Sequence, residues 1–209
     1  MFDTCPPPDL RGGFNVDDTV RAPLRDANGA VVAELGHVSA NLYLRRDALP
    51  YEGRLSLSYQ GVSLANEASQ RDVIVDVPLV TTTQILTARV GEALTSNGAS
   101  KVRVSGAEGL NPPGCTASPS LSSRVEILEA RGTLDPAKLV LDRDYARRIA
   151  VTFDWHDLGC GLSSVSGTVV LTFTTAHLGF NCNESIQLVG DAGPGLPFFD
   201  AAVADDRDG

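Results

Sequence analysis

An alternation of apolar and polar side chains over residues 148–176 constrains the fold of this chain more than any other feature. In the first arm every second position is apolar: Ile149, Val151, Phe153 and Trp155. The second arm keeps close to the same register: Val165, Val169, Leu171 and Phe173. Because successive side chains of a strand point to opposite faces of a sheet, this pattern predicts a β-hairpin with one buried face and one wet face.

Shorter segments of strand character precede the hairpin, at residues 30–35, 38–46, 54–60, 72–79, 101–105 and 124–132. A further segment at 184–190 is expected to add an edge strand. Residues 138–142 fit either a helix that starts at Asp135-Pro136 or an alternating strand, and we favour the strand. About ten strands with turns every several residues predict an all-β fold, an antiparallel β-sandwich.

One segment departs from the strand period and indicates a short amphipathic helix over about residues 82–96. Apolar residues lie at helical spacing: Leu86, Val90 and Ala93/Leu94. Thr81 and Gln84 can form a capping box at the start, and Asn97-Gly98 is a suitable stop at the end. The alternative is a strand broken at Gly91, since the β-branched residues of this segment favour strands.

Length and composition favour a single globular domain. The chain has 209 residues, 43% of them hydrophobic and 21% charged, and no linker divides it. We expect one β-sandwich domain over residues 30–190, an N-terminal extended or loop segment at 1–29 and an acidic flexible tail at 191–209. No apolar run is long enough to cross a bilayer, so the chain is expected not to span a membrane.

The charge balance bears on partners and source. The formal net charge is −9 and no basic cluster occurs, which argues against a nucleic-acid partner because phosphate binding needs gathered cations. Lys101 and Lys138 are the only lysines, and this arginine bias, together with abundant Ala, Gly, Asp and Pro, indicates a high-GC bacterium or its phage. The start lacks the features of a signal peptide, and Met1 fits either a start codon added to a mature exported domain or a native cytoplasmic start.

Four cysteines suggest where the protein works. Cys5, Cys115, Cys160 and Cys182 are widely separated and form no Cys-x-x-Cys pair, so metal or redox chemistry is not indicated. An even number of cysteines in loop-like segments predicts two structural disulfides and an extracytoplasmic location: periplasm, cell surface or secreted. The alternative is four free thiols in a reducing cytosol or in a virion assembled there.

Sheet geometry narrows the disulfide pairing. A strand over about 164–175 would span roughly 40 Å, which places Cys160 and Cys182 near opposite ends of the sandwich. If 138–142 is a strand, the up-and-down order predicts Cys115–Cys182 and Cys5–Cys160. If 138–142 is not a strand, the order reverses and Cys115 meets Cys160.

The break between the two hairpin arms holds the strongest candidates for a site. Asp154, His156 and Asp157 are weak candidates for a metal site or for a general base with an orienting acid. A metal needs three or four converging ligands, whereas neighbours at a strand end point in alternating directions. We favour a solvated hairpin tip, with Gly159 and Gly161 supplying positive φ and Trp155 anchoring the core, and expect no catalytic residue, metal or cofactor.

The favoured function is that of a non-catalytic, extracytoplasmic bacterial β-sandwich protein acting as a surface, adhesion or ligand-binding module, with a protein partner or a homo-oligomer. One alternative is a phage virion structural protein, either capsid-decorating or part of the tail. A second is a hydrolase using surface carboxylates, for which Asp154, Asp157 and Asp76 are the first residues to test. His37 and His177 are isolated beside turns and read as surface residues.

Overall fold

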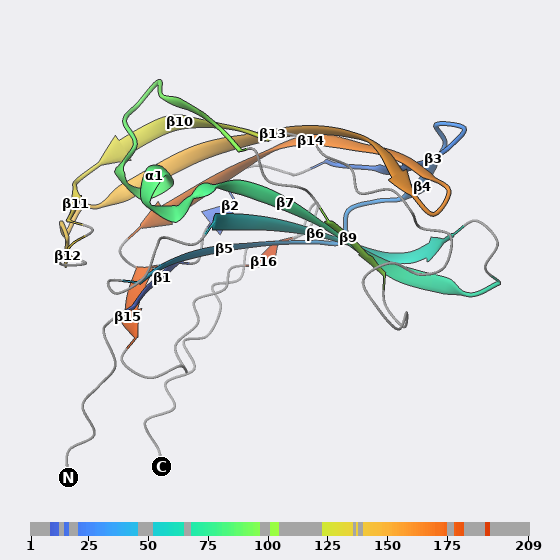
Figure 1. The fold of residues 1–209 in the computed structure, drawn as a ribbon, viewed down its shortest axis with the longest axis horizontal. Coiled ribbons are helices and arrows are strands. Elements are labelled where there is room, and N and C mark those ends of the chain that lie inside the picture. The colour runs from blue at the N-terminus through green and yellow to red at the C-terminus, as the bar shows by residue number, and fades with distance from the viewer. Residues whose placement is uncertain are drawn as a thin grey trace, which may run out of the picture.

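The computed structural model describes residues 9–12, 15–16, 21–45, 52–64, 68–96, 101–104, 123–135, 137, 140–174, 178–181 and 191–192. Within these residues the chain forms two facing layers of antiparallel strands and one short helix (Figure 1). The all-β antiparallel sandwich expected from the alternating pattern is therefore confirmed.

In the described part of the chain each main sheet has seven strands, and all of their pairings are antiparallel. The first sheet has the order β15-β1-β5-β6-β7-β9, with β16 also paired to β5. Its strands are β1 (Asp9–Gly12), β5 (His37–Arg45), β6 (Glu52–Ser63), β7 (Gln70–Thr81), β9 (Lys101–Val104), β15 (Leu178–Asn181) and β16 (Asp191–Ala192).

The second sheet has the order β4-β3-β14-β13-β10-β8, with β2 also paired to β14. Its strands are β2 (Asn15–Val16), β3 (Leu24–Asp26), β4 (Val31–Ala33), β8 (Ala93–Thr95), β10 (Arg124–Arg131), β13 (Ala146–Gly159) and β14 (Leu162–Thr174). A separate two-stranded ladder joins β11 (Leu134–Asp135) to β12 (Val140–Leu141). It lies between β10 and β13 in the sequence.

The core lies between the two main sheets, where the inward-facing residues of both meet. Its largest fully buried side chains include Leu24, Leu55, Leu57, Tyr59, Leu79, Phe153, Trp155 and Phe173. The rings of Phe153 and Trp155 meet edge to face with centroids 6.1 Å apart. Burying one such side chain stabilises the fold by about 1.5–3 kcal/mol, which explains why the alternating register of the hairpin fixes the sandwich.

The predicted helix is much shorter than expected. Helix α1 runs over Thr82–Thr87 and begins with the predicted capping box of Thr81 and Gln84, but Ala88 is already extended, with ψ 157°. The boundary at residue 96 is wrong because the chain turns at Gly91 and rejoins the second sheet as β8.

Backbone pairing explains the early end of α1. The Gly91 amide donates to the Ile127 carbonyl, and the Ile127 amide donates to the Glu92 carbonyl. Val90, placed on the buried face by the helical spacing, is 62% exposed. The alternative of a strand interrupted at Gly91 therefore describes the second half of this segment better than the helix does.

The two flanking segments contribute more to the sheets than expected. Residues 1–29, expected as a loop, supply β1, β2 and β3, because short strands carry too few residues to show an alternation. The expected flexible tail supplies β16, paired to β5, while 193–209 and the expected strand at 184–190 lie outside the described residues. The favoured strand at 138–142 is present as β12, two residues long.

The structure also removes the premise behind the predicted disulfide pairing. Strand β12 belongs to the small ladder with β11 and does not cross a main sheet, so it cannot set the up-and-down order. Cys5, Cys115 and Cys182 lie outside the described residues, so both pairings stay predictions.

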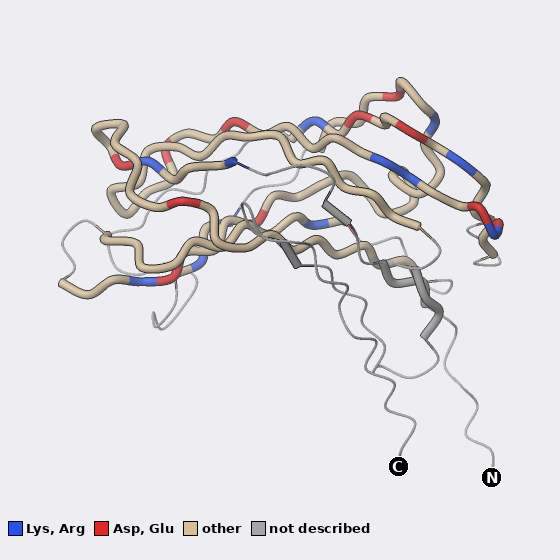
Figure 2. The backbone as a smooth tube through the Cα atoms, turned by 180° about the vertical axis from the view of Figure 1, so that it is seen from behind, with Lys and Arg blue, Asp and Glu red and all other residues tan. Residues whose placement is uncertain are grey.

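Charged positions are interspersed along both layers of the described chain (Figure 2). Helix α1 has six residues, far fewer than a bilayer span needs, and the described residues hold no longer apolar helix that could serve as one.

Two buried tyrosines fasten elements that are distant in the sequence. The Tyr59 hydroxyl of β6 donates to the Ala22 carbonyl at 2.6 Å and so joins the first sheet to the chain entering the second. The Tyr145 hydroxyl donates to the Leu86 carbonyl at 2.7 Å and holds α1 against the start of β13. Burial raises the pKa of both phenols far above the usual value, and the Glu34 charge raises the pKa of Tyr59 further.

This pKa shift predicts a loss of stability in alkali. Above about pH 10 the tyrosines ionise in the unfolded chain but stay protonated in the folded chain, so the free energy of unfolding falls by about 1.4 kcal/mol per pH unit for each. We expect urea unfolding to show that Tyr59→Phe is less stable than the native chain by about 1 kcal/mol near neutral pH. Between neutral pH and pH 11 its free energy of unfolding should fall less steeply than that of the native chain. An alkaline decline identical to that of the native chain would contradict this account.

Candidate functional site

The break in the alternating pattern is a tight turn. Gly159 pairs with Leu162, so Cys160 and Gly161 form a two-residue loop. Their φ angles of 54° and 75° are those of a type I′ turn, whose twist matches that of the flanking strands. The break is thus a hairpin tip, as favoured from the sequence. Glycine supplies positive φ at Gly159 and Gly161, but the positive φ of Cys160 was not foreseen.

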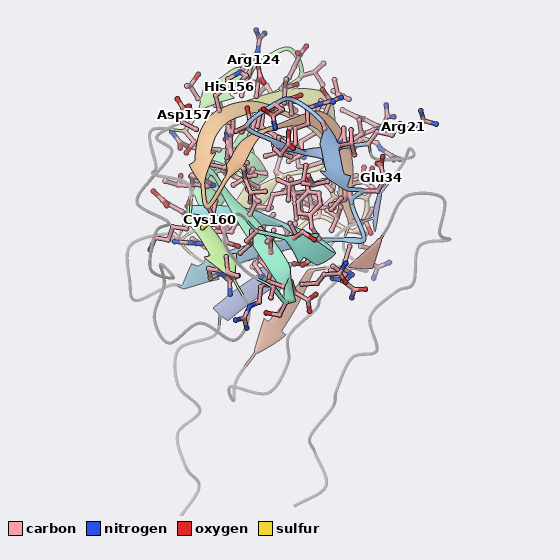
Figure 3. The ribbon with its side chains drawn as sticks, turned by 90° about the vertical axis from the view of Figure 1, so that its right-hand side faces the viewer. Arg21, Glu34, Arg124, His156, Asp157 and Cys160 are labelled. Carbon is pink, nitrogen blue, oxygen red and sulfur yellow. The ribbon has the colours of Figure 1, made fainter. Side chains whose placement is uncertain are left out.

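Asp154 and His156 form an exposed pair on the outer face of β13. The His156 Nε2 lies 3.3 Å from Asp154 Oδ1, and their side chains are 63% and 68% exposed. Trp155 between them points into the core and is fully buried. Asp157 follows in a bulge with φ 56°, and Figure 3 shows His156 and Asp157 at the outer surface of the sandwich.

This arrangement offers little chemistry beyond a weak ion pair. Among the described residues, no three His, Cys, Asp or Glu side chains gather in a way that could hold a metal ion. An exposed carboxylate–imidazole pair contributes about 0–1 kcal/mol when the histidine is protonated, because water screens the charges. Of the three candidates predicted from the sequence, the structure brings Asp154 and His156 into contact. Both side chains are exposed, as expected for residues at a solvated strand end.

Asp76, the third acid considered for hydrolysis, lies in the other sheet. It stands on the outer face of β7, with a side chain only 7% exposed. The Ser56 hydroxyl donates to Oδ1 at 2.6 Å, while Arg103 donates through Nε to Oδ2 at 2.8 Å and through Nη2 to Oδ1 at 3.1 Å. The carboxylate therefore fastens edge strand β9 to β7, and the structure does not bring it together with Asp154 or Asp157.

Bidentate contact with the carboxylate raises the pKa of the Arg103 guanidinium, chiefly through its hydrogen bond to Asp76. Sequence reasoning identified the acid but not its partner. The sequence predicts a strand over 101–105, yet it does not reveal the register that sets Arg103 diagonally across from Asp76.

Arg147 is a buried cation that the sequence did not single out. It lies in phase with the core residue Ile149 and is 4% exposed. Its Nη1 donates to the carbonyls of Arg131 at 2.6 Å, Ala146 at 2.8 Å and Gly132 at 3.3 Å. Its Nη2 donates to the Gly132 carbonyl at 3.2 Å. Its Nε has no hydrogen-bond partner among the described residues. Its guanidinium carbon lies 4.6 Å from the centroid of the Tyr145 ring. Because carbonyls already occupy its terminal nitrogens, this cation closes the turn after β10 and does not offer an anion site.

At the other end of β13, two hairpin tips are bonded to each other. The Ala27 amide in the β3–β4 turn donates to the Gly161 carbonyl in the β13–β14 turn at 3.1 Å. The β3–β4 turn is itself fixed, because Asp26 Oδ1 accepts the amides of Asn28 and Ala30, each at 2.9 Å. We call these two turns, residues 26–30 and 157–161, the paired tips; they lie at one end of the sandwich, opposite α1 (Figure 1).

The remaining candidates divide between the described residues and the rest. His37 lies in β5, partly buried, opposite Ser58, whereas His177 is outside the described residues. Cys160 is in the disulfide-bonded state and not a free thiol, although no disulfide joins two described residues. Which of the three other cysteines pairs with it stays a prediction.

We predict that Asp76 and Arg103 are energetically coupled. Arg103→Ala leaves a buried carboxylate with one hydroxyl donor, so the free energy of unfolding should fall by about 1–3 kcal/mol, toward the lower figure because the guanidinium is 45% exposed. In urea unfolding, Asp76→Asn combined with Arg103→Ala should cost less than the sum of the single changes.

Arg131→Ala is the matched control for this cycle. Arg131 Nε lies 2.7 Å from Glu129 Oε1, but both side chains are exposed, so its loss should cost less than about 0.5 kcal/mol. Strict additivity of Asp76→Asn and Arg103→Ala would refute a structural role for the pair.

Comparison with known proteins assigns no family. No protein-family model, no curated protein and no solved structure matches the chain. Function is therefore inferred from the geometry of the described residues.

Proposed function

We propose that this chain is a non-catalytic, extracytoplasmic bacterial β-sandwich protein that acts as a surface, adhesion or partner-binding module. The observation that carries the proposal is the pair of hairpin tips held together at one end of the sandwich by the Ala27–Gly161 hydrogen bond. Binding residues occur disproportionately on loops that a rigid scaffold positions, and this end has that arrangement.

The paired tips are preorganised for contact. Each tip is closed by its own bonds, with Asp26 capping one turn and the type I′ geometry closing the other. The side chains of Ala27, Asn28 and Asp157 are exposed there. Binding to turns that are already fixed costs less conformational entropy than binding that must order the turns. A modest contact area can therefore give measurable affinity.

The use made of acidic side chains favours binding over hydrolysis. Asp76 is committed to Ser56 and Arg103, and Asp142 Oδ2 accepts both the amide and the hydroxyl of Thr133. A glycosidase needs two carboxylates facing one space between them, and Asp76 lies in a different sheet from Asp154.

The cysteines support the proposed location. We infer that the chain carries two disulfides, Cys115–Cys182 and Cys5–Cys160, formed in an oxidising compartment. The bonded state of Cys160 supports this inference. It also suits the position, because a bond from the tip would restrain a residue that holds an unfavourable positive φ.

Thiol titration tests the location. We expect the protein purified from its native host, denatured without reductant, to show no free thiol. About four free thiols per chain would overturn the extracytoplasmic proposal and favour assembly in a reducing cytosol, as in a virion. Non-reducing peptide mapping tests the pairing separately, and a peptide linking Cys160 to Cys182 or to Cys115 would reject it.

Binding through the paired tips is tested with fluorescently labelled chain and cell envelopes of a high-GC bacterium. We expect saturable binding that Asn28→Arg with Asp157→Arg weakens about tenfold, a change of roughly 1.4 kcal/mol, because both substitutions place bulk and charge on the contact surface. Glu126→Arg, an exposed site on β10, is the control and should bind as the native chain does.

Two results would overturn the binding module. One is envelope binding that does not saturate or that ignores the tip substitutions. The other is hydrolysis of a polysaccharide or ester substrate that Asp154→Asn abolishes, since the exposed pair on β13 would then be catalytic.

A further inference from the structure

We propose that a second copy of this chain pairs antiparallel with edge strand β4, across a two-fold axis, so that the second sheets of the two copies join. The proposed contact lies on the flank of the sandwich, where β4 leaves the paired tips at residues 29–30, and it does not rest on the proposed binding function.

Strand β4 is an apolar edge. It terminates the second sheet, and no further strand of the described chain pairs with it. Its residues, Val31–Ala33, carry no charge, and Val31 is 45% exposed. Strand β9 at the edge of the first sheet carries Lys101 and Arg103, the kind of charged side chain that discourages strand addition. Strand β4 itself carries no such charge.

Charges of opposite sign flank this edge. Near its N-terminal end, Arg25 Nη1 donates to the Gly29 carbonyl at 2.8 Å, which holds the guanidinium beside the start of the strand. Just beyond its C-terminal end, Glu34 is exposed. Among the described residues, neither Arg25 nor Glu34 forms an ion pair. Figure 3 shows Glu34 projecting from the flank, where Arg21 also projects.

Antiparallel pairing makes these charges complementary. With Val32 opposite its symmetry mate, Glu34 of one copy stands opposite Ala30 of the other. There it is next to Gly29, whose carbonyl holds the Arg25 guanidinium. The two-fold axis generates the same contact twice, so a self-complementary interface contains two ion pairs around an apolar centre. Val31 of each copy, which is exposed in the single chain, then lies beside β4 of the other copy.

The size of the edge sets the strength of this dimer. The strand has three residues, and a bulge interrupts its pairing with β3 between Leu24 and Arg25. Few backbone hydrogen bonds can form, so the interface falls below the area of a permanent dimer and association is weak. Its two ion pairs are exposed to solvent, so added salt should weaken it further.

Sedimentation of the full chain over a range of concentrations tests the proposal. We expect a monomer–dimer equilibrium at high protein concentration, shifted toward monomer by salt. Arg25→Glu and Glu34→Arg should each weaken dimerisation by tenfold or more, because each sets like charges together. An equimolar mixture of the two variants should dimerise again, because every contact in the mixed dimer then joins opposite charges.

Asp144→Arg, which makes the same charge change as Glu34→Arg but near the start of β13, is the control and should dimerise as the native chain does. Restoration in the mixture separates an interface effect from damage to the fold, since misfolded chains would not rescue each other. A native chain that stays monomeric at every concentration would overturn the proposal. A dimer that ignores both charge reversals, or a mixture that stays monomeric, would do so as well.

Discussion

The close approach of the chain to β14 at Gly167 is the contact on which the sandwich depends. Gly167 pairs with Phe153 in the central hairpin, and a Cβ at this glycine would lie 2.8 Å from the Arg21 carbonyl and 3.2 Å from the Phe153 ring. The absence of a side chain lets the segment entering β3 lie directly over the hairpin. The next residue, Ala22, accepts the Tyr59 hydroxyl of the first sheet. One small residue thus allows the central hairpin, the chain between β2 and β3, and the opposite layer to meet.

The sequence predicted the elements whose packing is local and repetitive. Long strands such as β6, β7, β13 and β14 have enough alternating positions to reveal both their period and their buried face. The capping box of α1 was also readable, because it depends on residues three apart. The end of α1 was not readable, since Gly91 and Glu92 leave the helical path to pair with Ile127, a residue far along the chain. Strand pairing here outweighs helical spacing.

The same distinction applies to the candidate site. A hairpin tip was predictable because glycine and aspartate mark turns locally. The bidentate contact of Arg103 with Asp76 was not, because it depends on the register between β7 and β9. The role of Arg147 is harder to predict. Its position in phase with Ile149 breaks the apolar alternation, and the reason is seen only in the structure, where it donates to the carbonyls of the turn after β10. Carboxylates that looked available for chemistry are in part supports of the fold.

The two ends of the sandwich differ in how they use polar groups, and this difference bears on function. At the end formed by α1 and the start of β13, Tyr145 and Arg147 bury their donors against backbone carbonyls, so the polar atoms there stabilise a closed surface. At the other end backbone groups of the paired tips form hydrogen bonds with one another, and side chains such as Asn28 and Asp157 are left exposed. Groups that the fold does not need are the ones available to a partner. Contact with other molecules is therefore expected at the paired tips and along the β4 edge beside them, where polar and apolar groups remain uncommitted.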